Sequence, residues 1–522
     1  MNDTEFNLLH EPWILVMNAD GAIETVSIIS VFEQAHVIRS LSGELPTQDM
    51  SVFRLLLAIL YAADRHSENG DIFSDPEQAV SAWFSEWDKG QFNMDKIRNY
   101  LNKYEDRFYL FHPQRPFYQA NIVKGTEYDA SKLIGDLSES SNKPRLFSLR
   151  GEESKKRLDY AEAARWLLHI NSFDDSSIKP TTRGADLPPV GVGWLGKLGL
   201  ISTQGNNLFE TLMLNYVLLD RNEDSFPDGE AVWERNEVCI EERRKIPAPT
   251  SPLELLTLQS RRMLLNRDGS AVTGFKSIGG DVFPSENSMI EQMTVWKTDD
   301  DNGWKPKRHD ITRSIWRDYS VIISSNTDIM EPGVIRWFSY LKDHGLDYKF
   351  LRLRIVGMAY GDKNSSVEDV FEDSLSINAG LLADIGKIWN VRIEENLKLT
   401  DMCVKELGNF ARSLSEISGN GNDNRFQVSA DARRTAYYNL DQPFRRWLLS
   451  INPNDFNSLN DKMNEWLDIT KNETIRIGKQ MLDNSSETAI IGKSMSNNAI
   501  TKFRLFRNKI YELIGGDVNI QI

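Results

Sequence analysis

After about Ser374 the sequence changes character, and this change narrows the range of possible folds more than any other feature. The preceding residues alternate short strand-like runs with helices and turn signals, whereas the following ones form four helical segments joined by short polar loops. Four helices with short connections bury their apolar stripes in an up-down bundle. We therefore predict an α+β fold: a large mixed α/β domain over residues 1–374 and a C-terminal four-helix bundle over residues 375–522.

Local patterns predict individual elements of both domains. The predicted helices of the bundle are Asn378–Ser418, Ala430–Ser450, a third with an apolar stripe from Phe456 to Leu467, and Glu487–Leu513. The elements predicted in the first domain are a strand at Glu11–Met17, a helix at Val52–Ala63, a helix at Asp159–Ile170 that Asp159 can cap, helical periodicity over Pro252–Arg262, and a strand at Arg352–Val356 that runs into a turn at Tyr360–Ser366.

The composition is that of a soluble protein of more than one domain. A chain of 522 residues is too long for one ordinary core, and its 40% hydrophobic and 26% charged residues are typical of globular proteins. We expect no secretory signal and no membrane-spanning segment. Its two cysteines exclude a disulfide framework and a zinc site built on cysteines alone, so the simplest setting is a reducing cytoplasm.

The net charge of −15 argues against a protein that binds nucleic acid by itself. The charge is uneven, however: residues 378–522 hold 19 Lys and Arg against 18 Asp and Glu, so residues 1–377 carry −16. A subunit that borrows affinity from a larger basic assembly could still touch a duplex with a few cationic loops.

No pattern in the sequence predicts catalysis or metal binding. Gly191–Lys197 (GVGWLGK) resembles a phosphate-binding loop, but prolines precede it and Leu198 stands where a magnesium-binding hydroxyl is needed, so close packing of the loop is the default interpretation. The seven histidines form no zinc-protease spacing, and His309-Asp310 is a lone pair. We predict a protein without enzymatic activity, cofactor or metal.

Positive charges mixed with aromatic residues are the stronger signal. Trp304–Arg317 (WKPKRHDITRSIWR) combines five Lys and Arg with two tryptophans. Further cations recur at Lys502, Arg504, Arg507 and Lys509, and in the doublets Arg433-Arg434 and Arg445-Arg446. Each patch could contact nucleic acid, or it could be a solvated face or a set of salt bridges within the chain.

Four blocks, in order along the chain, resemble one known family. They are Asn7–Val16 (NLLHEPWILV), Leu45–Leu60 (LPTQDMSVFRLLLAIL), Arg107–Gln119 (RFYLFHPQRPFYQ) and Asn207–Leu214 (NLFETLML). The chain is similar in these blocks to the large subunit of type I-E CRISPR Cascade complexes, the CasA family. The resemblance implies a non-catalytic subunit that acts in antiviral defence.

The resemblance also implies partners: the other Cascade subunits and the guide RNA, double-stranded target DNA, and a helicase–nuclease that the complex recruits. The protein would read the protospacer-adjacent motif and open the duplex for an R-loop, while the guide reads the remaining sequence by base pairing. Some relatives carry a four-cysteine zinc ribbon, but this chain lacks those cysteines, so we expect no zinc.

The resemblance implies that three loops and one lysine would contact the DNA, the guide and a neighbouring subunit. Phe147 resembles an aromatic that docks against a neighbouring subunit and the guide. The region Lys179–Val190 corresponds to a glycine-rich loop that enters the minor groove, although it has only one glycine; the expected contacts are Lys179, Thr181, Thr182, Arg183 and Gly184.

The hairpin Ala359–Val367 (AYGDKNSSV) resembles a wedge whose glutamine tip splits the first base pair. Here Asn364 stands at the tip with Lys363 beside it, and a plain turn is the alternative interpretation. Lys276 is the candidate for a lysine that reads the motif.

Two other functions stay open on the sequence. The chain could be a scaffold whose bundle binds other proteins, or a hydrolase built on the acidic N-terminal domain with a site assembled only by the fold.

Overall fold

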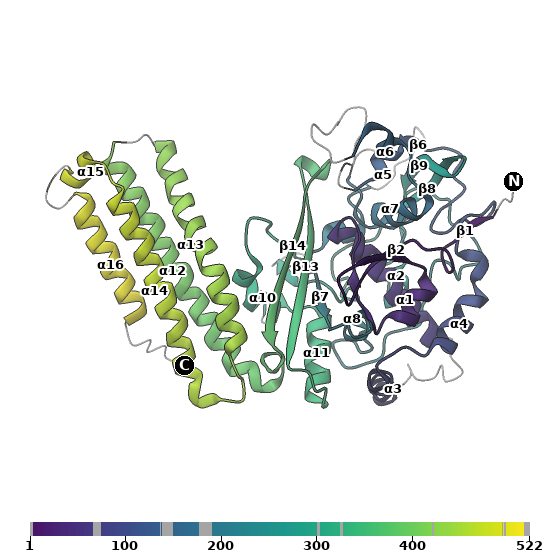
Figure 1. Ribbon diagram of the computed structural model, residues 1–522, viewed down its shortest axis with the longest axis horizontal. Coiled ribbons are helices and arrows are strands. Elements are labelled where there is room, and N and C mark those ends of the chain that lie inside the picture. Colours follow the sequence, from purple (N-terminus) through teal and green to yellow (C-terminus); the bar gives the residue numbers. More distant parts are fainter. Residues whose placement is uncertain are drawn as a thin grey trace. The chain divides into compact units, whose positions relative to one another are not determined.

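The computed structural model describes residues 4–65, 75–135, 137, 150–176, 190–299, 303–323, 327–419, 422–492, 494 and 497–515 (Figure 1). The chain forms two compact units, and the fold is α+β as predicted. The first unit consists of Met1–Ile311, Ser325–Phe338 and Arg352–Ser374, and the second of Thr312–Ser324, Ser339–Leu351 and Leu375–Ile522. The unit with the bundle therefore includes two segments from before Ser374. Within the described ranges, no helix is long and apolar enough to cross a bilayer.

Small antiparallel sheets and buried helices build the first unit. Strand β2 (Ile14–Asn18) lies between β3 (Ile23–Val26) and β4 (Ile38–Leu41), which bears out the early strand. Helix α2 (Pro46–Arg65) packs against α7 (Tyr160–Phe173). Both helices form the core of this unit.

The capping prediction at Asp159 is confirmed. The side chain of Asp159 accepts a hydrogen bond from the backbone N–H of Glu162 at 2.7 Å and begins α7. A carboxylate at this position satisfies a free backbone donor, and its negative charge interacts favourably with the positive end of the helix dipole.

The helix predicted over Pro252–Arg262 is wrong in its second half. Helix α9 (Pro252–Leu256) ends early, and β8 (Arg261–Asp268) begins at Arg261. Strand β8 pairs with β9 (Ala271–Gly279), which also pairs with β6 (Thr126–Asp129). Arg261 and Arg262 are almost fully buried and form ion pairs with Asp174 and Asp281. Strand pairing and these distant carboxylates override the local helical pattern.

The block Arg107–Gln119 is mostly core. Strand β5 (Tyr109–Phe111) pairs with β1 (Glu5–Asn7), and Phe117 is buried behind it. Gln119 fixes the segment, because its side-chain amide donates to the carbonyl of Leu110 at 2.7 Å and accepts from the N–H of Leu265 at 2.8 Å.

Long helices make up most of the second unit, and Figure 1 shows them running side by side. They are α12 (Lys387–Ile417), α13 (Asn422–Ser450), α14 (Leu459–Asp483) and α16 (Ala499–Gly515), with the short α15 (Glu487–Ile491) before α16. Helix α12 packs against each of the other three long helices.

Three helix boundaries differ from the prediction. Helix α13 begins at Asn422, eight residues before the predicted start at Ala430. Residues Asn378–Gly386 are not α-helical, because β14 (Val367–Asn378) runs to Asn378 and short 3-10 turns follow. The predicted helix Glu487–Leu513 is interrupted at Gly492, whose φ of +66° a helix cannot accommodate.

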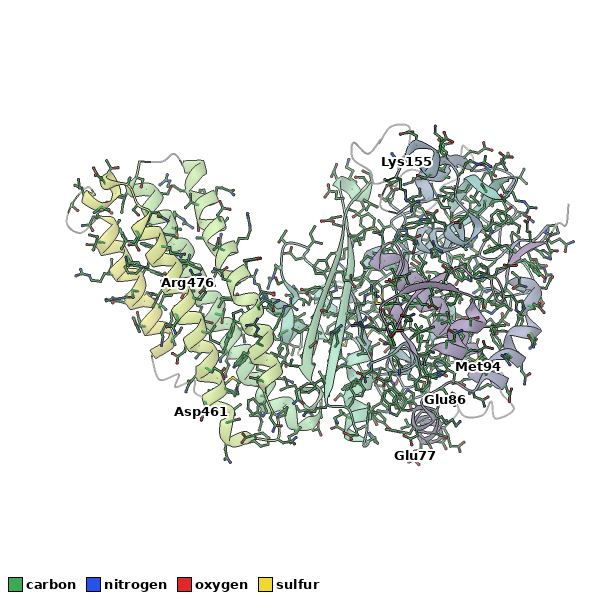
Figure 2. The ribbon with its side chains drawn as sticks, viewed as in Figure 1. Glu77, Glu86, Met94, Lys155, Asp461 and Arg476 are labelled. Carbon is green, nitrogen blue, oxygen red and sulfur yellow. The ribbon has the colours of Figure 1, made fainter. Side chains whose placement is uncertain are left out.

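Aromatic residues fill the centre of the bundle. Trp316, Phe444 and Trp466 pack with ring centroids 4.8 to 6.0 Å apart. The indole N–H of Trp466 donates to the hydroxyl of Thr400 at 2.9 Å, so the buried nitrogen is satisfied. Polar side chains such as Asp461 and Arg476 on α14, both labelled in Figure 2, are exposed, but so are some large hydrophobic ones such as Phe426 on α13.

Candidate nucleic-acid interface

A long β-hairpin, of which residues Arg352–Ser374 belong to the first unit, carries the predicted wedge. Its strands are β13 (Phe350–Tyr360) and β14, and β13 also pairs with β7 (Leu200–Gln204). Residues 361–366 connect the two strands, so the segment expected to form a hairpin tip does so. The sheet fixes the base of the hairpin.

The tip has an uncommon backbone. Lys363 and Asn364 are consecutive non-glycine residues in the left-handed region, with φ of +53° and +54°. The N–H of Asn364 donates to the carbonyl of Gly361 at 2.8 Å, and the N–H of Gly361 donates to the carbonyl of Ser366 at 2.9 Å. A left-handed residue costs roughly 1–2 kcal/mol, although asparagine tolerates it better than most. The surrounding contacts must therefore hold this conformation.

Ser176 supplies one set of these contacts. Its backbone N–H and its hydroxyl both lie within hydrogen-bond distance of the carbonyl oxygen of Asn364, at 2.8 and 2.9 Å. The same hydroxyl lies 2.6 Å from the carbonyl oxygen of Lys363. The tip is thus joined to the segment that follows α7.

Arg308 supplies the second set. Its guanidinium donates to Oδ1 of Asn364 at 3.1 Å and lies over the ring of Tyr360, 5.4 Å from the centroid. The hydroxyl of Tyr360 donates to the carbonyl of Phe173 at 2.6 Å. Because a guanidinium can only donate, it selects the amide orientation in which Oδ1 faces Arg308 and Nδ2 faces away.

A buried ionic cluster holds the chain on both sides of residues 177–189. The guanidinium of Arg261 donates from Nε to the carboxylate of Asp174 at 2.6 Å. It also donates to the carbonyl of Asp175 at 2.8 Å and to that of Gly191 at 2.9 Å. One side chain therefore binds the backbone before and after this segment.

Lys132 completes the cluster, with its ammonium 2.8 Å from Oδ2 of Asp175. Burial by itself would lower the pKa of Lys132, but the carboxylates of Asp174 and Asp175 raise it above its ordinary value. Lys132 therefore stays charged, and the cluster is composed of paired charges.

Six of the predicted site residues lie outside the described residues. They are Phe147 and the proposed groove contacts Lys179, Thr181, Thr182, Arg183 and Gly184. For the groove contacts, the structure gives only the flanking anchors, Ser176 and Gly191.

Lys276 lies on a strand and not in a loop. It occupies the middle of β9, and its ammonium is 3.3 Å from Oε1 of Glu127 on the neighbouring strand β6. The side chain of Glu127 is 69% exposed. An exposed pair of this kind contributes about 0–1 kcal/mol, so a competing anion can replace Glu127 at little cost.

The loop Gly191–Lys197 packs closely, in agreement with its default interpretation. A side chain at Gly193 would collide with the backbone of Ser172, and one at Gly196 would collide with the hydroxyl of Tyr360. Glycine at both positions therefore lets the chain approach α7 and the hairpin.

The C-terminal end of the basic segment Trp304–Arg317 turns inward. Trp316 is buried in the bundle, and the guanidinium of Arg317 stacks on Tyr437 with 3.3 Å to the ring centroid. Arg313 pairs with Asp318 at 3.4 Å. Arg308 differs, since no carboxylate among the described residues lies within ion-pair distance of it.

The other cationic patches also contain two kinds of arginine: some pair with a carboxylate of the chain, and others have no described carboxylate beside them. Arg445 and Arg434 form ion pairs within α13, with Asp441 and Asp431. On α16, Arg504 and Arg507 are exposed, and no described carboxylate pairs with them. These two arginines remain available for an external anion.

Sequence reasoning missed the roles of Ser176 and Arg308. Arg308 belonged to a patch noted for its charge, but its contact with Asn364 joins residues 56 positions apart. Nothing local in the sequence indicates that Ser176 meets the hairpin. The described ranges contain no cluster of three or more His, Cys, Asp and Glu side chains suited to a metal ion.

Comparison with known proteins gives a consistent result. The family model described as CRISPR-associated protein Cse1 matches residues 7–477. A CRISPR-associated protein CasA/Cse1 of Thermus thermophilus is 30% identical over 427 residues, which cover 79% of this chain and 77% of the relative. The crystal structure of Thermobifida fusca Cse1 superposes with a TM-score of 0.84 at 27% identity and covers 98% of both chains. A chain of a CRISPR RNA-guided surveillance complex shares the fold, with a TM-score of 0.71 at 17% identity, over 97% of this chain and 99% of that one.

Proposed function

Because this chain belongs to the Cse1 family of CRISPR-associated proteins, we propose that it is the large subunit of an RNA-guided Cascade complex in antiviral defence. In this role it assembles with the other Cascade subunits and the guide RNA. It recognises the protospacer-adjacent motif on double-stranded DNA, opens the duplex for R-loop formation and recruits the helicase–nuclease. It catalyses no reaction of its own. The shared fold with a chain of a CRISPR RNA-guided surveillance complex supports the assembly role.

The observation that carries the proposal is the fixed amide at the hairpin tip. Arg308 binds Oδ1 of Asn364, and no described residue accepts a hydrogen bond from its Nδ2. The amide therefore presents a donor, and exposed base edges offer acceptors such as N7 and O6 of guanine. A hydrogen bond to a base edge that pairing would otherwise cover stabilises the opened strand.

Preorganisation supports the same role. Ser176 and Arg308 hold the left-handed backbone and the amide of Asn364 in one conformation before DNA arrives. A tip that is already ordered loses less conformational entropy when it enters the duplex. Lys363 beside it is exposed and can contact a phosphate.

The remaining contacts follow from the same proposal. Lys179, Thr181, Thr182, Arg183 and Gly184 would enter the minor groove, where a cation is favoured by the negative potential. Lys276 would exchange Glu127 for an acceptor in the motif. Phe147 would dock against the neighbouring subunit and the guide.

The decisive experiment replaces Asn364 in the assembled complex. We expect Asn364→Ala to leave assembly intact and to weaken strand opening about fivefold, since one hydrogen bond is worth about 1 kcal/mol. Opening is measured by the fluorescence of 2-aminopurine next to the motif. Asn102→Ala, on an exposed face of α4 (Met94–Lys103), is the matched control and should change nothing. R-loop formation that is unchanged in Asn364→Ala would contradict the wedge.

A further inference from the structure

A cavity in the first unit lies beside the block Arg107–Gln119 and has no part in the proposed DNA surface. It is open to solvent and has a volume of about 40 Å³ for the centres of water-sized molecules. Three arginines line it: Arg107 and Arg115 from the block, and Arg235 from a loop far along the chain. Glu237 is the single carboxylate in the lining. The cavity therefore has an excess of two positive charges.

The three guanidiniums have no ion-pair or hydrogen-bond partner in the described part of the chain. Arg107, Arg115 and Arg235 are half-buried, yet none forms an ion pair or a side-chain hydrogen bond with another described residue. Other enclosed arginines of the same unit are paired, such as Arg165 with Glu44 at 2.6 Å and Arg354 with Asp49 at 2.9 Å. Partly desolvated guanidiniums that no described carboxylate pairs with are costly, so an external anion is the natural partner.

Hydrogen bonds fix two of the residues that line the cavity, Trp233 and Gln119. The indole N–H of Trp233 donates to the hydroxyl of Tyr100 at 2.7 Å, and Tyr100 donates to Glu234 at 2.8 Å. Gln119 is fixed by its two hydrogen bonds and is 2% exposed. The lining is thus ordered in the absence of a ligand.

Tyr118 adds a neutral donor to the lining. Its φ of +54° places it in the left-handed region, which is uncommon for an aromatic residue. No described residue accepts a hydrogen bond from its hydroxyl. Burial raises the pKa of Tyr118 above its ordinary value, so the hydroxyl keeps its proton.

We propose that this cavity binds the phosphate of a phosphate monoester, with Arg107, Arg115 and Arg235 as its ligands. A phosphate dianion matches the two excess charges, and guanidinium forks donate paired hydrogen bonds to its oxygens. The monoester can belong to a free nucleotide or to the 5′ end of a nucleic-acid strand. This site is independent of duplex opening at the hairpin.

The test is calorimetric titration of the full chain at constant ionic strength with inorganic phosphate, AMP, and a trinucleotide with or without a 5′-phosphate. We expect saturable binding of inorganic phosphate. Tighter binding of AMP than of the phosphorylated trinucleotide indicates a free nucleotide, and the reverse order indicates a strand end. The absence of saturable binding by all phosphate species overturns the proposal.

Variants assign the binding to this cavity. Arg115→Gln and Arg235→Gln should each weaken phosphate binding at least tenfold, because each removes a charge-assisted hydrogen-bond donor. Arg235→Lys keeps the charge and should lose less, which separates anion binding from misfolding. Arg157→Gln is the control, since Arg157 is exposed and pairs with Asp268 elsewhere. Binding that persists unchanged in both glutamine variants would refute the assignment.

Discussion

The backbone N–H of Ser176 donates to the carbonyl oxygen of Asn364 at 2.8 Å, and its hydroxyl lies 2.9 Å from the same oxygen. Ser176 directly precedes residues 177–189, which contain the proposed groove contacts. The wedge tip and the start of the groove segment are therefore joined at one point. In our proposal the two segments that touch DNA share an anchor, and displacement of one affects the other.

The backbone and the side chain of Asn364 can be separated by substitution. Asn364→Gly should be at least as stable as Asn364→Ala, since glycine adopts φ of +54° without the roughly 1–2 kcal/mol cost of a Cβ. Both variants lack the amide, so both should open DNA more slowly. Thermal unfolding and R-loop formation measure the two effects. A glycine variant that opens DNA normally would assign the function to the backbone of the tip.

The groove segment should contribute through charge. Lys179→Ala and Arg183→Ala are each expected to weaken duplex binding and to reduce the slope of log K against log salt by about one. Titrations of the complex with duplex DNA at several salt concentrations measure this slope. Lys398→Ala, on an exposed surface of α12, is the control. Affinity and slope that stay unchanged in both variants would make Lys179 and Arg183 structural residues.

The cluster around Arg261 should dominate the stability of the first unit. Arg261→Met removes the guanidinium that donates to Asp174 at 2.6 Å and to the carbonyls of Asp175 and Gly191 at 2.8 and 2.9 Å, so we expect a loss of about 3–5 kcal/mol. Arg157→Met breaks only an exposed pair with Asp268 and should cost less than about 1 kcal/mol. Unfolding of each variant in urea measures the two losses in free energy of unfolding. Equal losses in the two variants would contradict the assigned role.

Acid should destabilise the first unit through His169. Burial lowers the pKa of His169 to about 3, although Asp174 and Glu44 act in the opposite direction. The unfolded chain has an ordinary value near 6.5, so the neutral side chain stabilises the fold fully above that pH. This contribution is lost as the pH falls from about 6.5 toward 3, by up to about 1.4 kcal/mol per pH unit.

His169→Gln should reduce the pH dependence between about pH 6 and 5, because glutamine can still bind the hydroxyl of Thr47 but takes up no proton. The control is His36→Gln: because His36 is exposed, this change should leave the pH dependence of stability unaltered. Melting temperatures across this range are the measurement. A His169→Gln profile that matches the parent would show that other groups control acid unfolding.

Local patterns were sufficient where a structure depends on neighbouring residues. Asp159 caps α7 by binding the N–H of Glu162, three residues away, and the sequence predicted this helix start. The hairpin was also predictable, because an alternating strand runs into a turn with the polar residues that turns require.

Long-range contacts explain what could not be predicted. Arg262 was expected to be helical, but it lies on a strand because its guanidinium pairs with Asp281 and β8 pairs with β9. Ser176 meets Asn364 across 188 positions, a contact that no local pattern encodes. The fold class therefore follows from periodicity, whereas the supports of the site depend on the tertiary structure.

The hydrogen bonds from Arg261 to the carbonyls of Asp175 and Gly191 also have a consequence for how such a protein can evolve. Because one buried side chain fixes both flanks, we expect changes in the composition or length of the thirteen residues 177–189 to leave the scaffold intact. Each doubling of length adds only about 0.6 kcal/mol to the entropic cost of closing a connection between two fixed points. Under the proposed function, residues 177–189 can therefore be replaced while the scaffold stays the same, and new preferences for DNA can arise in this way.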